Sequence, residues 1–530
     1  MAVARAHVDT ARRMNGEPLL PAPLVVRGHL VTFDEVLGVI PDGELYVDRD
    51  GLIVAVGRAG DPPPAGFSGS AANVVDAGDA VVYPGLIDLH NHIAYNCLPL
   101  WIAPGRDEPW TARYEWPKDP DYLPSITLPV NALCRVAGKA VLKYVETKAV
   151  VGGVTAIQGS SKVGRPFEGW MVRNVEYETF GTGRVGVRQA VFALEGEEEF
   201  ARTREALARG DAFIYHLAEG TDPALVAEYS ALESRDVLAP GFVGVHCTAL
   251  GDPEYSGWSP RGGSVVWSPF SNLWLYGAMT DVAAARARGM RICLGADWSP
   301  SGSKSLLGEL KVADLVNREL LGGLFSAEDI CRMATCNPAQ AVGWEGRVGR
   351  LSVGLHADLV VVARRSDDVY DNLVRAVEDD VLLVAINGYP MYGIGELMAA
   401  GAAVNPEPVG VGAGVGPRVI TLRDERIEDA DMTWPSVLEA LEAVRRDPGA
   451  AAARQPSVAA AGGGGGGHLE LIPDMPWDGP AQARVAAMDL GEAKIPPLDS
   501  LVHDDAYFDA VARAPLHGGV LSGLREYYER

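Results

Sequence analysis

The sequence predicts an α/β protein built around a (β/α)8 TIM-type barrel, with a small β-sandwich domain formed by both flanks and a C-terminal extension. Three observations lead to this fold class. Residues 84–342 alternate apolar runs with helix-like stretches, the apolar runs are continuous, and the segment has about the 250 residues that such a barrel needs. Continuous apolar runs are typical of parallel strands that are buried on both faces.

The two flanks of this segment have a different pattern. Residues 24–83 consist of short strand-like runs separated by turn residues, and a similar pattern returns after residue 342. We therefore assign residues 1–83 and 343–398 to the N-terminal and C-terminal parts of one β-sandwich domain. The barrel would be inserted between them.

Within the barrel segment we expect seven strands and place the remaining one, the second, between Trp101 and Val151. A doubly wound open sheet is the structural alternative, and the lack of a G-x-G-x-x-G motif after the first strand makes it less favourable. The seven expected strands are 86–90, 154–161, 185–194, 212–219, 242–249, 264–271 and 291–297.

The segment 399–530 is read as an extension. It contains a helix that begins after Thr433, a Gly-rich linker at 462–467 and an amphipathic helix near 504–514. Its sequence is compatible with a cover over the barrel or with a contact between subunits.

Composition limits the partners. The formal net charge is −24, from 70 acidic and 46 basic residues, which argues against nucleic acid and anionic membranes. No run of about 18 apolar residues indicates a membrane span, and the N-terminus lacks the apolar stretch of a signal peptide. The six cysteines form no CxxC pair. We expect a cytoplasmic protein that acts on a small molecule.

Two histidines stand one residue apart at the end of the first barrel strand. In a strand, residues i and i+2 point to the same face, so His90 and His92 in "LIDLHNH" can reach one metal ion. Two polar residues near a loop would explain this pair equally well. Other strands must therefore supply further ligands if a metal site exists.

Three later strands do end in candidate groups. They offer His216 with Glu219, then His246, then Asp297, whereas the other six histidines of the chain lie outside the barrel segment. Each residue alone could be a buried structural group. Because active sites of such barrels lie at the carboxyl ends of the strands, the groups together predict a shared metal site.

These residues resemble the amidohydrolase superfamily, and specifically its aminohydrolase branch of cytosine and guanine deaminases, S-adenosylhomocysteine deaminases and triazine hydrolases. The resemblance covers about residues 24–395, and it implies a metal-dependent barrel with a small β-sandwich from both chain ends. It is carried by "PGLIDLHNH" (84–92), "HLAE" (216–219), His246, "SPFSN" (268–272), "LGAD" (294–297) and "NPAQAVG…GRVGRLSVGLHADLVVV" (337–362).

Chemistry and resemblance together suggest roles. One divalent metal needs three or four N and O ligands, which His90, His92, His216 and Asp297 supply; Zn²⁺ fits them and Fe²⁺ is also compatible. Asp297 can also take a proton from the attacking water. The resemblance assigns the protonation of a ring nitrogen to Glu219.

The resemblance also places His246 on the substrate side. Two alternatives remain for this site. Glu219 could instead orient a histidine, and a binuclear centre could use Glu195 at the end of the fourth strand as a bridge.

The implied function is hydrolytic deamination of an aminated heterocycle. Alternatives with the same architecture are release of chloride or an alkylamine, opening of a cyclic amide, and a scaffold that has lost its metal. Members of this branch are commonly dimers or larger, so a homo-oligomer is compatible with the resemblance. Candidate substrate contacts, each with a purely structural alternative, are Trp101, Arg113, Gln158, Asn272 and Trp298.

Overall fold

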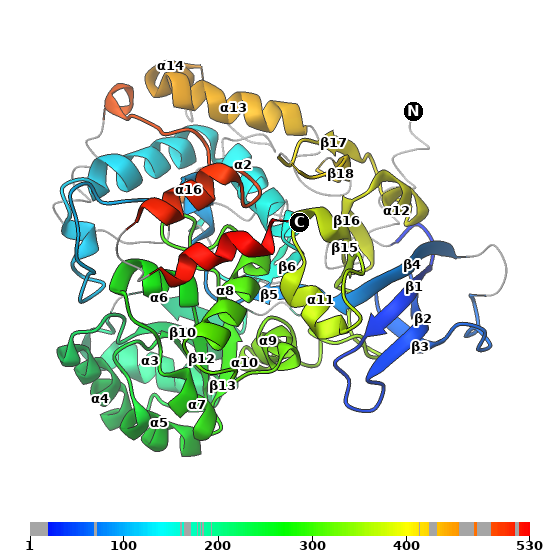
Figure 1. Cartoon of the computed structure of the whole chain (residues 1–530), viewed down its shortest axis with the longest axis horizontal. Helices are drawn as coiled ribbons and strands as arrows, with labels where there is room; N and C mark the ends of the chain where they lie inside the picture. Colours follow the sequence, from blue (N-terminus) through cyan, green and yellow to red (C-terminus); the bar gives the residue numbers. More distant parts are fainter. Residues whose placement is uncertain are drawn as a thin grey trace.

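The structure is a computed structural model that describes residues 20–67, 72–159, 162–163, 171–177, 179–180, 182, 185–191, 193–412, 414–422, 432–454, 471–473, 489–514 and 519–529 (Figure 1). The Gly-rich linker expected at 462–467 lies outside these residues.

Both flanks contribute to one nine-stranded sheet. Strand β4 (Asn73–Pro84) of the N-terminal flank pairs antiparallel with β14 (Leu359–Val362) of the C-terminal flank, with Leu359 opposite Pro84. In spatial order the strands are β17 (Glu407–Val409), β18 (Arg418–Ile420), β16 (Tyr389–Gly393), β15 (Val381–Ile386), β14 (Leu359–Val362), β4 (Asn73–Pro84), β1 (Leu24–Val31), β2 (Val39–Val47) and β3 (Ile53–Arg58). Strands β17 and β18 lie beyond residue 398, so the start of the extension joins this sheet.

The central segment forms two parallel sheets. One has the order β5 (Leu86–Asp88), β6 (Val154–Ile157), β8 (Arg173–Asn174). The other has the order β13 (Arg291–Leu294), β12 (Ser264–Trp267), β11 (Phe242–His246), β10 (Ala212–Leu217), β9 (Val187–Ala190). A backbone hydrogen bond from Asp297 N–H to His90 O (2.8 Å) links the carboxyl ends of β13 and β5.

The predicted position of the second strand is wrong. The described residues between Trp101 and Val151 form a loop, short helices and the long helix α2 (Leu128–Val151), and the run at 154–157 is the second strand of its sheet. The strand that we did not identify is β8. It has two residues, Arg173 and Asn174, and therefore no apolar run that could reveal it.

Helices cover the sheets, and the extension packs on them. Helix α13 (Trp434–Arg446), which begins where Thr433 caps it as expected, lies along α2, and η9 (Val520–Tyr527) lies against α8 (Leu306–Glu319). The rings of Tyr144 and Trp434 stack between α2 and α13 at 5.8 Å. None of the described helices has the length and apolar character needed to cross a membrane.

The remaining short elements are η1 (Ile93–Cys97), η2 (Trp116–Lys118), η3 (Leu123–Thr127), β7 (Lys162–Val163), α3 (Gly196–Ala208), η4 (Pro223–Leu225), α4 (Val226–Ser234), α5 (Asp252–Trp258), η5 (Ser259–Arg261), α6 (Pro269–Tyr276), α7 (Val282–Ala287), α9 (Ala327–Met333), α10 (Cys336–Ala341), α11 (Val369–Arg375), η6 (Glu378–Asp380), α12 (Gly395–Ala400), α14 (Pro448–Ala453), β19 (Leu471–Ile472), η8 (Leu490–Glu492) and α16 (Asp505–Arg513).

Candidate active site

Four histidines and one aspartate meet at the carboxyl ends of the parallel strands. The ring centroid of His90 lies 4.7 Å from those of His216 and His246 and 5.2 Å from that of His92. All five side chains are buried. We call this group the histidine cluster; it consists of His90, His92, His216, His246 and Asp297.

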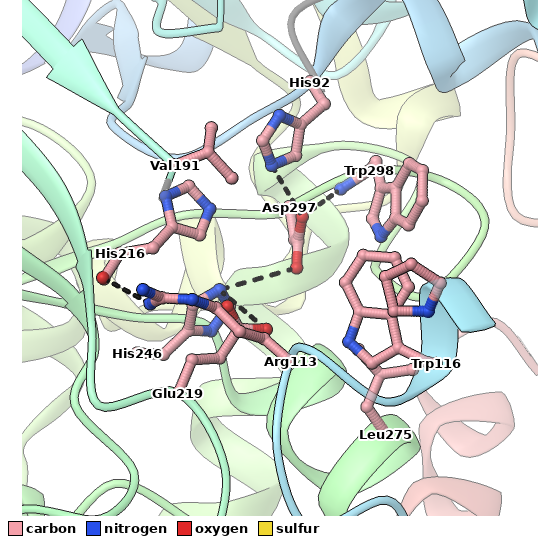
Figure 2. A pocket seen from close by; sticks show the side chains of 11 residues that line it. His92, Arg113, Trp116, Val191, His216, Glu219, His246, Leu275, Asp297 and Trp298 are labelled. Atoms are coloured by element: carbon pink, nitrogen blue, oxygen red, sulfur yellow. Dashed lines mark hydrogen bonds and ion pairs between the residues drawn. The ribbon is translucent and has the colours of Figure 1, made fainter. Parts of the chain in front are cut away.

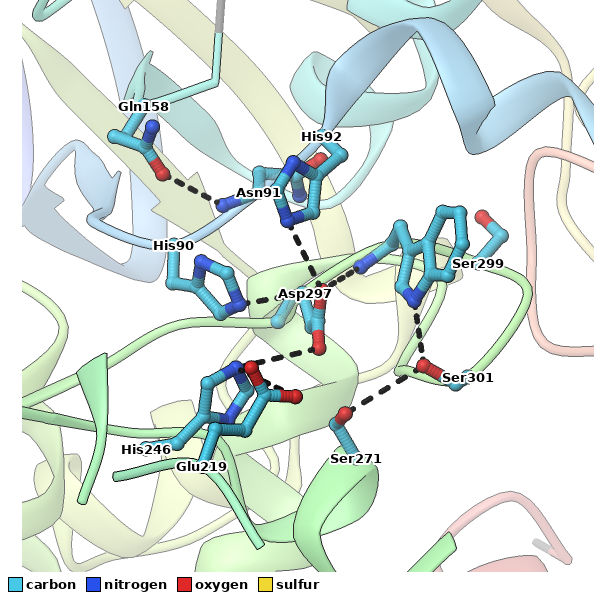
Figure 3. A network of polar contacts seen from close by, with 12 residues as sticks. His90, Asn91, His92, Gln158, Glu219, His246, Ser271, Asp297, Ser299 and Ser301 are labelled. Carbon is cyan, nitrogen blue, oxygen red and sulfur yellow. Dashed lines mark hydrogen bonds and ion pairs between the residues drawn. The ribbon is translucent and has the colours of Figure 1, made fainter. Parts of the chain in front are cut away.

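The carboxylate of Asp297 lies among the imidazoles (Figures 2 and 3). Its Oδ1 is 3.2 Å from His90 Nε2 and 3.9 Å from His92 Nε2, and its Oδ2 is 3.9 Å from His246 Nε2. Within two sets of three, His90–His216–His246 and His90–His92–Asp297, one N or O atom of each residue lies within 4.8 Å of the others. This spacing is suitable for shared coordination of one cation.

The protonation states also suit a metal. Burial lowers the pKa of His90. The pKa of His216 is lowered strongly, because burial and the nearby imidazoles of His90, His92 and His246 both disfavour its protonated form. Burial alone would raise the pKa of Asp297, but His90, His246 and His92 outweigh it and the pKa is lowered. Neutral imidazoles beside a charged carboxylate are the forms that bind a divalent metal.

The ring nitrogens provide a further test of this fit. Among the described residues, Nδ1 of His90 and Nδ1 of His216 are buried and have no hydrogen-bond partner. Buried polar atoms are normally paired, since leaving them unpaired costs free energy. A set of close, buried N and O donors with unpaired nitrogens is what a metal site without its ion would present, and the donor types match Zn²⁺ or Fe²⁺.

The backbone at the strand ends explains the local sequence. Gly295 precedes Asp297 because a Cβ there would lie 2.4 Å from His90 Cβ. His246 and Asp297 adopt positive φ angles of 63° and 59°, which are unusual for residues other than glycine and are often found at functional sites. The backbone is therefore held so that both side chains reach the cluster.

Glu219 lies next to the cluster. Its Oε1 is 3.7 Å from His246 Nε2 and accepts a hydrogen bond from the Tyr276 hydroxyl (2.5 Å), which in turn accepts one from Trp116 Nε1 (3.1 Å). Tyr276 was not among the residues that we identified from the sequence. It lies in an apolar helix, α6, where nothing in the sequence separates it from the packed aromatic residues.

A small cavity opens onto these groups (Figure 2). Five predicted polar groups face it, namely His92, His216, Glu219, His246 and Asp297. The rest of its described wall consists of Arg113, Trp116, Pro117, Val191, Leu275 and Trp298. Of the five predicted substrate contacts, Arg113 and Trp298 line the cavity.

The guanidinium of Arg113 is already engaged. Its NH1 donates to His216 O (2.5 Å), and its NH2 donates to Glu228 Oε1 (3.1 Å) and to the Tyr114 hydroxyl (2.8 Å). Arg113 was expected to hold a carboxylate or carbonyl of the substrate. The donors NH1 and NH2 fix the backbone of His216 and the neighbouring loop, whereas Nε is buried and has no hydrogen-bond partner among the described residues.

The other three predicted contacts do not line this cavity. Asn272 Oδ1 lies 3.0 Å from His246 Nδ1, so Asn272 orients that imidazole. Gln158 accepts from Asn91 N–H (3.1 Å) and donates to Glu176, and it ends the second strand rather than the third. Trp101 Nε1 donates to Asp121, and its ring lines a separate cavity.

The binuclear alternative depends on Glu195. This residue is exposed, it precedes α3 as the N-cap residue, and it is in neither of the clusters that could hold a metal. A mononuclear site is therefore favoured. Asp358, in the quoted stretch 337–362, forms a buried ion pair with Arg173 that joins β8 to the nine-stranded sheet.

Comparisons with known proteins agree with this site. The model of the Amidohydrolase family matches residues 230–390. The 5-methylthioadenosine/S-adenosylhomocysteine deaminase of Moorella thermoacetica is 27% identical over 404 residues, which is 68% of this chain and 92% of that protein.

Solved structures are similar in fold. A zinc-bound adenosine deaminase from Xanthomonas campestris has a TM-score of 0.52 at 21% identity, covering 73% of this chain and 98% of that chain. The triazine hydrolase of Arthrobacter aurescens has a TM-score of 0.58 at 16% identity, covering 80% and 99%. The chain is thus similar in sequence to the Amidohydrolase family and to a curated deaminase, and similar in fold to solved deaminase and triazine hydrolase structures.

Proposed function

We propose that the protein is a metal-dependent hydrolase that removes an amino group from an aminated heterocycle. The observation that carries this proposal is the histidine cluster with Glu219 beside it, all opening onto one cavity. The Moorella thermoacetica deaminase aligns with this chain over 92% of its own length, and this similarity supports the same class of reaction.

We further propose that the two parallel sheets form the (β/α)8 barrel of residues 84–342, carried by a β-sandwich from 1–83 and 343–398. Similarity in fold to the zinc-bound deaminase and the triazine hydrolase supports this arrangement. We place the protein in the cytoplasm, acting as a monomer or homo-oligomer on a small molecule.

His90, His92, His216 and Asp297 would hold the metal, with Zn²⁺ as the first choice. When bound, a divalent cation lowers the pKa of a water molecule to about 7 and so supplies a nucleophile at neutral pH. Asp297 Oδ2 lies toward His246 and Glu219, where it can accept the proton of the attacking water. His246, oriented by Asn272, faces the same space and would contact the attacked centre.

Glu219 would be the proton donor to the ring. Protonation of a ring nitrogen makes the neighbouring carbon electrophilic. The departing amine would take the proton that the attacking water gave to Asp297, and Glu219 would regain its proton from the remaining hydroxyl as the ring carbonyl forms. The Tyr276 hydroxyl donates to Glu219 and fixes the orientation of its carboxyl group.

The wall of the cavity offers aromatic and apolar surface to a planar ring. Trp116 and Trp298 stand on its wall with ring centroids 5.6 Å apart, and Val191, Leu275 and Pro117 add apolar surface. Aromatic side chains of this kind contact flat heterocycles through their faces and edges.

The test is ammonia release by zinc-loaded protein across aminopyrimidines, aminopurines, pterins and aminotriazines, with Glu219→Gln as the matched variant. We expect one ring class to release ammonia, and the variant to lose roughly 10²–10⁴-fold in rate. If zinc is bound but no ring releases ammonia, deamination is rejected. Chloride or alkylamine release and cyclic-amide opening are then the reactions to assay.

A further inference from the structure

A second group of buried charges lies between the extension and the barrel. Asp499, which precedes α16, inserts its carboxylate between the ammonium groups of Lys148 of α2 and Lys304, which follows β13. We call these three residues the lysine–aspartate cluster. All three are at least 94% buried, with exposures of 6%, 1% and 4% for Asp499, Lys148 and Lys304.

The backbone of Asp499 is also fixed. Its N–H donates to Cys97 O (2.9 Å), at the end of the short helix η1 that follows His92, and its carbonyl accepts from the Tyr144 hydroxyl. The extension is thus bonded to the loop after the first barrel strand. Burying three charges is costly unless they are paired, so such a group needs a reason to persist.

Lys148 connects Asp499 to the loops on which the histidine cluster stands. Its Nζ donates to Asp499 Oδ2, to Asn96 O (3.0 Å) and to Ser299 Oγ (2.6 Å). Asn96 Oδ1 in turn accepts from Ser299 N–H (2.9 Å). The loop after His92 and the loop after Asp297 are therefore tied to each other at the point where Lys148 enters.

The network continues to the backbone of the ligands themselves. Asn96 Nδ2 donates to Asn91 Oδ1 (2.9 Å), and Asn91 Nδ2 donates to Asp88 Oδ2 (3.0 Å). Asp88 Oδ1 then accepts from the N–H groups of His90 (3.2 Å) and Ala296 (3.1 Å). The hydrogen bonds thus lead from Asp499 through Lys148, Asn96, Asn91 and Asp88 to the backbone of His90 and of Ala296, the residue before Asp297.

The extension also holds the far end of the loop after Asp297. Lys304 N–H donates to His503 Nε2 (3.2 Å), while His503 Nδ1 lies 2.7 Å from Glu378 Oε1. The Tyr507 hydroxyl donates to Gly302 O (3.4 Å). Residues 299–304 are thus enclosed between the histidine cluster on one side and the extension on the other.

We propose that Asp499 is a positioning residue for the histidine cluster: through Lys148 and Lys304 it fixes the two loops that carry His92 and Asp297. This inference rests on the metal centre of the proposed function, and it gives the extension a role in the active site. Asp499 touches neither substrate nor metal. Losing its charge would leave two neighbouring ammonium groups without a counter-charge and release both loops.

The test compares Asp499→Asn with Asp509→Asn. Asp509 is an exposed carboxylate of the same extension and pairs with Arg525 at 3.1 Å, so it controls for loss of an acidic group there. We would measure zinc affinity by competition with a chromophoric chelator, and the visible spectrum of the Co²⁺-substituted protein, which reports the arrangement of the ligands. Neither measurement needs a substrate.

We expect Asp499→Asn to bind zinc about tenfold more weakly and to change the cobalt spectrum, since supporting residues of metal ligands commonly contribute 10–100-fold to affinity. Asp509→Asn should match the wild type. A folded Asp499→Asn protein with wild-type zinc affinity and cobalt spectrum would overturn the proposal.

Two other outcomes of this experiment have to be distinguished. If Asp499→Asn does not fold, Asp499→Asn with Lys304→Gln removes one of the two unbalanced ammonium groups, and it is judged by the same two measurements. If the wild type itself binds no zinc, the proposed function fails before any variant is made. The two failures are therefore distinguished.

Discussion

The two buried charged groups of this protein differ in how their polar atoms are paired. In the lysine–aspartate cluster, Lys148 Nζ donates to three acceptors and both carboxylate oxygens of Asp499 face an ammonium group. In the histidine cluster, Nδ1 of His90 and Nδ1 of His216 have no hydrogen-bond partner among the described residues. A fully paired group stabilises the fold, whereas close donors that are left unpaired are arranged for a ligand.

The strongest way to break this comparison is to change the histidine cluster. We expect Asp297→Asn and His216→Ala to reduce activity to background and to release the metal, because each removes one of few ligands. Metal content and ammonia release, measured on the same samples, check this. Activity that persists in either variant would mean that the cluster is not the catalytic centre.

Lys148→Met should instead affect stability first. It removes one partner of a buried ion pair and leaves part of the Asp499 charge uncompensated, for which we expect a loss of about 3 kcal/mol in the free energy of unfolding. Urea denaturation of the wild type and of Lys148→Met measures this difference in the free energy of unfolding. An unchanged midpoint would show that the lysine–aspartate cluster does not hold the extension to helix α2 and the loop after β13.

Glu146 of α2 is a buried carboxylate outside both clusters. It accepts hydrogen bonds from the backbone N–H groups of Met171 (2.9 Å) and Val172. Burial raises its pKa to about 7 from an ordinary 4.5, although Lys143 and these N–H groups act in the opposite direction. The folded state therefore binds more protons than the unfolded chain between these values, and stability falls as pH rises from 4.5 to 7.

Glu146→Gln removes this titration. The loss of stability between pH 5 and pH 8 should be smaller in the variant than in the wild type, by about 2 kcal/mol. Denaturation curves at the two pH values provide the comparison. Equal losses in both proteins would show that Glu146 has the same pKa in the folded and unfolded states.

Tyr276→Phe is the mildest change. It removes one hydrogen bond to a carboxylate, worth roughly 1.5 kcal/mol, so we expect about a tenfold fall in kcat with little change in metal content. A kcat identical to that of the wild type would remove Tyr276 from the mechanism.

The sequence allowed the strand-end groups to be found because a parallel sheet brings consecutive strand ends together. The order of the strands alone was enough to identify the five residues of the histidine cluster. Strand β8 could not be found, since its two polar residues give no periodic signal.

The substrate contacts were harder to predict for a different reason. Residues such as Asn272 and Gln158 lie near the site, but their hydrogen bonds are made to other residues, and only the folded side chains decide this. Asp499 could not be identified either. It meets Lys148 across 351 positions of the chain, and no local pattern records such a pair.

The metal content of the purified protein tests the central claim most directly. Mass spectrometry of the wild type and of His90→Ala, after equilibration with Zn²⁺ and removal of loosely bound ions, should give about one zinc per wild-type chain and almost none in the variant. Equal zinc in both proteins, or none in the wild type, would contradict the assignment of the histidine cluster as a metal centre.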